Sequence, residues 1–323
     1  MSIKVRYKQI YNTLKQAHNV LVVSHPRCGD ALGSTLAFGQ LLSSMQKKYT
    51  LYTHDDIPQE LQFLPYIHEV VVKDEDIKMA DFDVVLIVDA NRHMTGINDK
   101  IEHEIDETRT TIINIDHHVT NKGEGDINII DVDASSTTFL IYNFFVDNGL
   151  PISRDIATCL LVGILYDTGN FSNSATNDAA IEVASELMNT GAPLTMITDA
   201  LIVNKKIDSL RMWGSILARI EHNEAYDIVH TTITRDDYEE HAMEASAGEI
   251  ANFLNGIADG SFNMIMKESE DGLIKVSLRT THDTVDVAKF AQYFGGGGHK
   301  KAAGFALKGQ LVYNERTKKY RIV

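Results

Sequence analysis

Cysteine and long apolar runs are scarce in this chain of 323 residues. Only two cysteines occur, Cys28 and Cys159, so the sequence has neither a disulfide framework nor a Cys-x-x-Cys metal knuckle. No apolar run approaches the roughly 18 residues of a membrane span. The pattern of residues 1–19 predicts an amphipathic helix and lacks the apolar region of a secretory signal. These absences predict a cytoplasmic protein with no membrane partner.

Positive charge is also in short supply. The chain has 30 Lys and Arg against 45 Asp and Glu, a net charge of −15. Binding to a long polyphosphate backbone usually needs a positive surface, so this charge argues against a long duplex as partner. The deficit is uneven, because residues 300–323 contain one acid, Glu315, and seven basic residues: Lys300, Lys301, Lys308, Arg316, Lys318, Lys319 and Arg321. A short nucleotide therefore stays compatible with the composition.

The apolar pattern of the first half predicts an α/β domain. Short runs rich in Val, Ile and Leu alternate with helical stretches such as 31–45 and 135–145; the clearest runs are Val20–Ser24, Tyr49–Thr53, Val84–Val88 and Thr111–Ile115. Strands of this kind are buried on both faces, which is typical of a parallel sheet with helical crossovers. For residues 1–190 we expect a doubly wound, mainly parallel sheet with helices on both faces.

The pattern changes in the remaining sequence. Residues 177–223 are predicted to be helical with breaks at 191–193 and 204–206, and a helix over 206–222 falls in a predicted connector of residues 191–224. Residues 225–323 then combine predicted strands at 227–234, 262–267 and 273–280 with predicted helices at 247–254 and 285–293. This mixture predicts a smaller C-terminal α+β domain.

Acidic and imidazole side chains recur at the ends of these elements in the first domain, namely His25, Cys28, Asp30, Asp89, Asp116, His117, His118 and Asp167. Each alone is better explained as a helix cap, a turn former or a core histidine. However, the carboxyl ends of parallel strands meet at one edge of the sheet, where three His and four Asp would repel one another without cations. Imidazole with carboxylate suits Mn²⁺, with Mg²⁺, Co²⁺ or Zn²⁺ as competitors, and a two-metal site activates water and clamps a phosphoryl group.

These same motifs resemble the DHH phosphoesterase superfamily. The shared segments are SH and GDALGS within Ser24–Ser34, VDA at Val88–Ala90, DHH at Asp116–His118 and YDTGNF at Tyr166–Phe171. VSLRT at Val276–Thr280 and GGGGHKKAAGF at Gly295–Phe305 are similar to the arginine-bearing strand and the glycine-rich signature of the DHH-associated substrate domain. The resemblance covers nearly the whole chain, and within the superfamily it is nearest to the branch of bacterial nanoRNases and phosphoadenosine-phosphate (pAp) phosphatases.

The resemblance implies roles for individual residues. His25 and Asp89 would hold a first metal, and Asp30, His117 and Asp167 a second, with Asp89 bridging. His118 would lie near the scissile phosphate as a polarising or acid group, and Asp116 would orient an imidazole. In the second domain Arg279 and His299 would grip a phosphate or nucleotide, with anion contacts from the backbone amides of Gly295, Gly296, Gly297 and Gly298. Tyr293 and Phe294, just before these glycines, are either core residues or stack on a base.

One segment departs from the family pattern. The first motif usually reads His, three residues, Asp, one residue, Asp, whereas here Cys28 replaces the first Asp and the spacing from His25 to Asp30 is one residue short. A Cys28 thiolate ligand would favour Zn²⁺ or Fe²⁺ over Mn²⁺. Alternatively, Cys28 is an unligated thiol, and one metal is held firmly and the other weakly.

We therefore expect a metal-dependent phosphoesterase with two ions, most simply Mn²⁺, acting on very short oligoribonucleotides or on pAp-like nucleotides. A cyclic-dinucleotide phosphodiesterase is an alternative with the same chemistry. A nucleotide-binding sensor with decayed catalysis is an alternative of another class, motivated by Cys28. The sequence also allows a homodimer.

Overall fold

The computed structural model describes residues 2–73, 75, 77–106, 108–173, 175–203, 207–237, 254, 259–269, 272–298, 300–317 and 319–323. The chain divides into two compact units, Met1–Asn204 and Lys205–Val323. This division falls inside the predicted connector of residues 191–224. Each unit is built around its own sheet.

A parallel six-stranded sheet organises the first unit, in the order β3-β2-β1-β4-β5-β6. Every neighbouring pair in it is parallel. The order reverses direction between β1 and β4, which makes their carboxyl ends the expected place for a ligand. The strands are β1 (Asn19–Ser24), β2 (Lys48–Thr53), β3 (Val70–Val71), β4 (Val84–Val88), β5 (Thr111–Asp116) and β6 (Ile127–Ile130).

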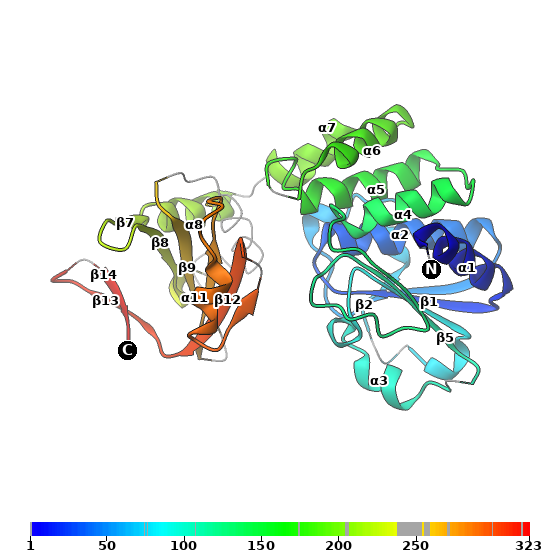
Figure 1. The fold of residues 1–323 in the computed structure, drawn as a ribbon, viewed down its shortest axis with the longest axis horizontal. Coiled ribbons are helices and arrows are strands. Elements are labelled where there is room, and N and C mark those ends of the chain that lie inside the picture. Colours follow the sequence, from blue (N-terminus) through cyan, green and yellow to red (C-terminus); the bar gives the residue numbers. More distant parts are fainter. Residues whose placement is uncertain are drawn as a thin grey trace. The chain divides into compact units, whose positions relative to one another are not determined.

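Both faces of this sheet are buried, as the apolar strands predict. Val20 and Val22 of β1 belong to the larger core, whereas Leu21 and Val23 belong to a smaller core on the other face. Figure 1 shows α1, α2, α4 and α5 over one face and α3 near the other. The helices are α1 (Ile3–Gln16), α2 (Gly29–Ser44), α3 (Asn98–His103), α4 (Thr137–Asp147), α5 (Arg154–Asp167), α6 (Asp178–Asn189) and α7 (Leu194–Thr198), which is followed by a π-helical turn at Asp199–Val203.

The α/β class, the four predicted strands and the helices predicted at the N-terminus, at 31–45 and at 135–145 are confirmed. The strands β3 and β6 are apolar but only two and four residues long, and neither was predicted from the sequence. Helix α2 is buried along nearly its whole length, because it packs against α5 and α4 on one side and the sheet on the other.

The second unit has a mixed sheet in the order β11-β12-β10-β9-β8-β7, and a separate two-stranded sheet, β13-β14. β8 and β9 pair in parallel, and the other pairs are antiparallel. The elements are α8 (Ile207–Leu217), β7 (Glu221–Asn223), β8 (Ile228–Ile233), β9 (Phe262–Glu268), β10 (Leu273–Arg279), α11 (Val287–Gln292), β11 (Gly297–Gly298), β12 (Ala302–Lys308), β13 (Leu311–Asn314) and β14 (Lys319–Ile322). This confirms the predicted α+β class.

One predicted helix is too long. The helix expected over 206–222 ends at Leu217, and Glu221–Asn223 instead forms β7, which pairs with Ile228–His230 of β8. The reason is a hairpin turn over residues 223–227, in which Asp227 adopts a left-handed backbone with φ 53°. The helix predicted at 247–254 lies outside the described residues except for Leu254.

An ion pair between partly buried Arg219 and buried Asp237 supports the second unit. The Arg219 guanidinium donates to both carboxylate oxygens of Asp237, at 2.5 and 2.7 Å. Asp237 also accepts the backbone N–H of Thr234 at 2.7 Å and its hydroxyl at 2.8 Å. Burial raises the pKa of Asp237, but the hydrogen bonds from Arg219 and Thr234 outweigh it and lower that pKa.

We predict that Asp237→Asn lowers the free energy of unfolding by about 3 kcal/mol at pH 7, because Arg219 loses its buried partner. A carboxyl group whose pKa is lower in the folded state than in the unfolded state stabilises the fold at pH values above its unfolded-state pKa of about 3.9. This stabilisation is lost as the pH falls through the pKa of the folded state. In urea unfolding, the difference in free energy of unfolding between Asp237→Asn and wild type should therefore become smaller below about pH 4. Asp236→Asn, at an exposed neighbouring position, is the control; equal losses for both variants would contradict this assignment.

Candidate metal centre

The predicted ligands of the first unit come together at the carboxyl edge of its sheet. His25 directly follows β1, Asp89 directly follows β4, and Asp116 ends β5 with His117 and His118 next to it. Asp30 lies in the first turn of α2, and Asp167 is the last residue of α5. Two crossover helices and three strands thus deliver these side chains to one place.

Asp89 is the centre of this group. Its side chain is 1% exposed. The Oδ2 atom lies 3.1 Å from His25 Nε2, while Oδ1 lies 3.6 Å from His117 Nε2 and 3.7 Å from His118 Nδ1. Its backbone has a φ of 53°, in the left-handed region that a residue with a side chain seldom adopts, and its N–H donates to Ile115 O at 2.9 Å. A strained backbone at a buried carboxylate is typical of a functional site.

Within the described residues, two sets of potential ligands share Asp89. One consists of His25, Asp89 and His118, and the other of Asp30, Asp89 and His117; in each set the ligand atoms lie within 4.8 Å of one another. A shared carboxylate between two ligand sets is the arrangement that two bridged cations require.

The histidine tautomers also fit metal binding. His117 Nδ1 lies 3.2 Å from Ala134 O, and His25 Nδ1 lies 3.1 Å from Pro26 O. A carbonyl only accepts, so each ring donates from Nδ1, and Nε2 is the nitrogen that faces the carboxylates and would be offered to a cation. His117 Nε2 is buried and makes no aligned hydrogen bond, although Asp167 Oδ2 is 2.9 Å away. A buried, unsatisfied imidazole nitrogen among carboxylates is a donor set suited to a divalent cation.

The electrostatics of the cluster also favour a bound cation. Burial, then the charges of Asp30 and Asp167, raise the pKa of Asp89 well above its ordinary value. Burial lowers the pKa of His117, but the Asp167 carboxylate 2.9 Å from Nε2 and the charges of Asp30 and Asp89 outweigh it and raise that pKa to about 10. The buried carboxylates therefore attract positive charge strongly, which protons or cations can supply.

Asp116 has the geometry that its predicted orienting role requires. Its Oδ1 lies 2.7 Å from His118 Nδ1 and accepts the backbone N–H of His117 at 2.7 Å. Its Oδ2 accepts from Asn121 Nδ2 at 2.6 Å, and Asn121 in turn contacts Asn114. The hydrogen bond with Asp116, the largest cause, raises the pKa of His118. Neither asparagine was predicted from the sequence, because neither belongs to a recognisable motif.

Cys28 and Asp167 belong to neither ligand set. Cys28 Sγ donates to Asp89 Oδ2 at 3.7 Å, and burial, followed by the charge of Asp89, raises the pKa of its thiol. Asp167 contacts the cluster through His117. Ligation by either residue therefore stays a prediction, and the geometry gives Cys28 a hydrogen bond to the shared carboxylate.

The predicted substrate residues lie in the second unit. Arg279 ends β10 and pairs with Ala302 of β12, and Gly298 of β11 pairs with Ala303, the next residue of β12. Arg279 and the last glycines are therefore at the same end of the sheet. Burial lowers the pKa of Arg279, whose guanidinium donates to Leu278 O at 3.0 Å. His299 lies outside the described residues.

The glycine run only partly matches the expected anion site. The N–H of Gly295 donates to Gln292 O at 3.1 Å and that of Gly296 donates to Ala291 O at 3.0 Å, so both amides end helix α11 rather than facing a ligand. The expectation of four anion-binding amides is corrected to this extent, because a helix end needs partners for its last carbonyls.

The two aromatic residues before the glycines differ in their surroundings. Phe294 stacks on Phe305 with ring centroids 4.5 Å apart, whereas the side chain of Tyr293 is 89% exposed. The prediction that Tyr293 is a core residue is therefore wrong, because its ring is exposed to solvent. The next residue, Phe294, is held by its stacking on Phe305.

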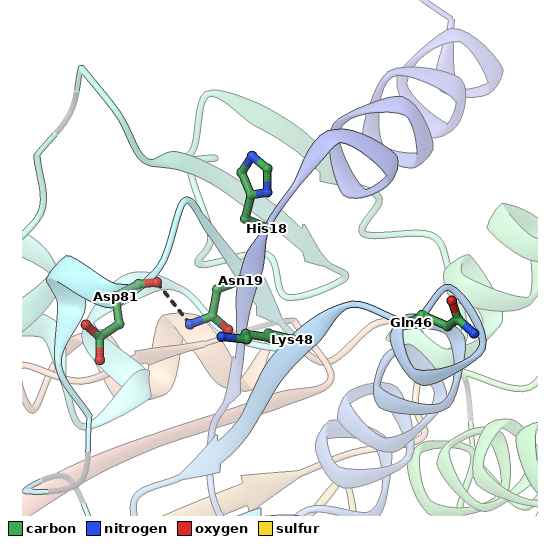
Figure 2. A pocket seen from close by; sticks show the side chains of 5 residues that line it. All are labelled: His18, Asn19, Gln46, Lys48 and Asp81. Atoms are coloured by element: carbon green, nitrogen blue, oxygen red, sulfur yellow. Dashed lines mark hydrogen bonds between the residues drawn. The ribbon is translucent and has the colours of Figure 1, made fainter.

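A shallow hollow lies at the opposite edge of the first sheet (Figure 2), lined by His18, Asn19, Gln46, Lys48 and Asp81. Asn19 begins β1 and Lys48 begins β2, so the hollow is at the amino ends of the strands. Asn19 Nδ2 donates to Asp81 O there, at 2.9 Å. Since the ligand sets lie at the carboxyl ends, we assign the chemistry to them and not to this hollow.

The comparisons with known proteins identify the class of this chain. The DHH family, N-terminal domain, matches residues 19–164, and the DHHA1 domain matches residues 227–320. The chain therefore combines an N-terminal domain of the DHH family with a C-terminal DHHA1 domain. In the part of the chain that the structure describes, no helix is long and apolar enough to cross a membrane.

Its relatives point to one branch of that class. The bifunctional oligoribonuclease and PAP phosphatase NrnA of Thermus thermophilus is 28% identical over 281 residues, 87% of this chain and 81% of that protein. The probable bifunctional oligoribonuclease and PAP phosphatase NrnA of Streptococcus mutans is 28% identical over 318 residues, 96% of each chain. The crystal structure of an exopolyphosphatase-related protein from Bacteroides fragilis has a TM-score of 0.85 at 24% identity, covering 95% of this chain and 92% of that chain, and shares the fold.

Close packing at the glycine run leads to a prediction. A Cβ on Gly296 would lie 2.1 Å from Gly304 O, whereas a Cβ on Gly297 would meet nothing within 4 Å. Gly296→Ala should therefore lower the free energy of unfolding by about 1–3 kcal/mol through overpacking, and Gly297→Ala, the control, should change it by less than about 1 kcal/mol. Urea unfolding checks both; similar stabilities for the two variants would show that β11 and β12 are not packed this closely.

Proposed function

We propose that this chain hydrolyses phosphoester bonds of very short oligoribonucleotides and of pAp-like nucleotides, with divalent cations held at the carboxyl edge of the first sheet. The observation that carries the proposal is the pair of ligand sets that share the buried carboxylate of Asp89. The names of the two NrnA relatives support the substrate class.

The residues present fit the cations that the proposal requires. His25 and Asp89 would hold one, and Asp30, His117 and Asp167 the other, with Mn²⁺ best suited to this mixture of imidazole and carboxylate. His118 also lies in the first ligand set, but we leave it to the substrate because Asp116 already holds its Nδ1. When bound, such cations would supply a more acidic water and positive charge for the phosphoryl oxygens. Cys28 adds a soft donor at the edge of the first set, so Zn²⁺ or Fe²⁺ is the alternative occupant there.

The chain's own groups would orient the reaction. In the hydrolysis, the oxygen of water bonds to phosphorus, the bond from phosphorus to the ester oxygen breaks, and the leaving oxygen takes up a proton. Asp116 holds His118 through Nδ1, which leaves Nε2 to bind a phosphoryl oxygen or to deliver that proton. The His118 side chain is 35% exposed, so a substrate can reach it.

The second unit carries further residues that we propose as contacts to a nucleotide. Arg279 and the end of β11 lie at the same end of the sheet of this unit. We propose that they contact a phosphate, together with His299. Two of the four glycine amides are used by α11, and Gly297 and Gly298 pair with β12, so the amide of these two that faces away from β12 is the remaining candidate for an anion contact. Exposed Tyr293, close by in the chain, offers a face on which a base can stack.

Activity assays test the proposed function. With Mn²⁺, we expect turnover of a diribonucleotide and of pAp, loss of turnover with EDTA, and recovery when Mn²⁺ is restored. Asp89→Asn should lower kcat/KM by more than about 100-fold, beyond the 10- to 100-fold typical of residues that only support a ligand. Cyclic di-AMP and pyrophosphate are the comparison substrates. A folded, Mn²⁺-loaded protein that binds nucleotide but turns over none of the four would instead establish the sensor alternative.

A second assay addresses Tyr293. Tyr293→Ala should raise KM for the diribonucleotide about tenfold with little change in kcat, because one stacked base is worth about 1–3 kcal/mol. Tyr293→Phe keeps the ring and should behave as wild type. Tyr226→Ala removes another exposed tyrosine of the same unit, 75% exposed, and serves as the control. An unchanged KM in Tyr293→Ala would remove this residue from the proposed binding surface.

A further inference from the structure

The first turn of helix α4 reaches into the carboxylate cluster. The backbone N–H of Thr137 donates to Asp30 Oδ2 at 2.6 Å, and that of Thr138 donates to Asp30 Oδ1 at 2.8 Å. The hydroxyl of Thr137 donates to Asp89 Oδ1 at 2.9 Å. All of these side chains are fully buried or nearly so. Thr137 therefore contacts the carboxylates of both ligand sets, through two different groups.

We infer that Thr137 is a positioning residue that fixes the bridging orientation of Asp89 and its distance from Asp30. This inference rests on the proposed metal site. A bridging carboxylate has to direct one oxygen to each cation. Asp89 Oδ2 faces His25, and Oδ1 faces His117 and His118. A carboxylate can rotate about its last side-chain bond, and the Thr137 hydroxyl on Oδ1 opposes that rotation.

The packing around this turn shows that the arrangement is built into the core. Gly163 of α5 lies against it, and a Cβ there would be 2.4 Å from Asp30 Oδ1 and 2.3 Å from the Thr138 hydroxyl. The absence of a side chain on Gly163 thus makes room for the Asp30 carboxylate and for the start of α4. The hydroxyl of Ser136 caps α4 by accepting the N–H of Phe139, which keeps the first amides of the helix in place.

Thr138 provides a matched comparison within the same turn. Its hydroxyl pairs with the hydroxyl of Ser136 at 2.9 Å, while only its backbone reaches Asp30. Replacing either threonine by valine removes a hydroxyl of the same size from the same buried turn and keeps the backbone amides. Only the change at Thr137 removes a hydrogen bond to the shared carboxylate.

Calorimetric titration of the metal-stripped full chain with MnCl₂ tests the inference without any assay of turnover. We expect Thr137→Val to weaken Mn²⁺ binding about 10-fold or more, as is typical for loss of a group that orients a ligand. Thr137→Ser, which keeps the hydroxyl, and Thr138→Val should stay within about twofold of wild type. The Mn²⁺ electron paramagnetic resonance spectrum of the loaded wild type should show two coupled ions, and that coupling should be lost or reduced in Thr137→Val.

The outcomes separate the two proposals. Unchanged affinity and coupling in Thr137→Val, or an equal loss in Thr138→Val, would overturn the positioning role while leaving the metal site intact. A folded wild type that binds no Mn²⁺, Zn²⁺ or Fe²⁺ would overturn the proposed function and this inference with it. If Thr137→Val does not fold, Thr137→Ala against Thr137→Ser decides, because equal affinities for these two variants would exclude the hydroxyl.

Discussion

The buried charge of Asp89 is the constraint on which the rest of the first unit depends. Removing a carboxylate from water is costly unless hydrogen bonds or positive charge surround it. Asp89 receives a hydroxyl from Thr137, a thiol from Cys28 and the approach of three imidazoles. These partners come from three separate segments, so the fold has to close around the carboxylate before it is satisfied.

The parallel sheet provides the means to do so. Its order reverses between β1 and β4, which brings His25 and Asp89 next to each other although they are 64 residues apart in the chain. The crossover helices then complete the site: α2 brings Asp30, α4 brings its first amides, and α5 brings Asp167 together with the gap at Gly163. The apolar strands thus serve the chemistry by making one edge of the sheet a meeting point.

The net charge of −15 has a different meaning after these observations. Several acidic residues of the first unit form a buried cluster suited to cations, so they do not oppose a phosphate partner once cations are present. The basic C-terminal stretch is partly committed to structure as well, since Lys301 pairs with Asp283 at 2.9 Å and Lys319 pairs with Glu221 at 2.8 Å. A short nucleotide needs few such charges, whereas a long duplex needs many.

The sequence by itself determined the class of each unit, the main strands and the titratable residues at the strand ends. The reason is that the periodicity of apolar residues and the spacing of motifs are local properties of the chain. The sequence could not show that Thr137 reaches Asp89 or that Cys28 donates a hydrogen bond to the same carboxylate. Nor could it show that two glycine amides are used by α11 or that Tyr293 is exposed. Those features were decided by the tertiary structure, because they depend on contacts between segments or on local packing, and no periodicity or spacing along the chain encodes either of these.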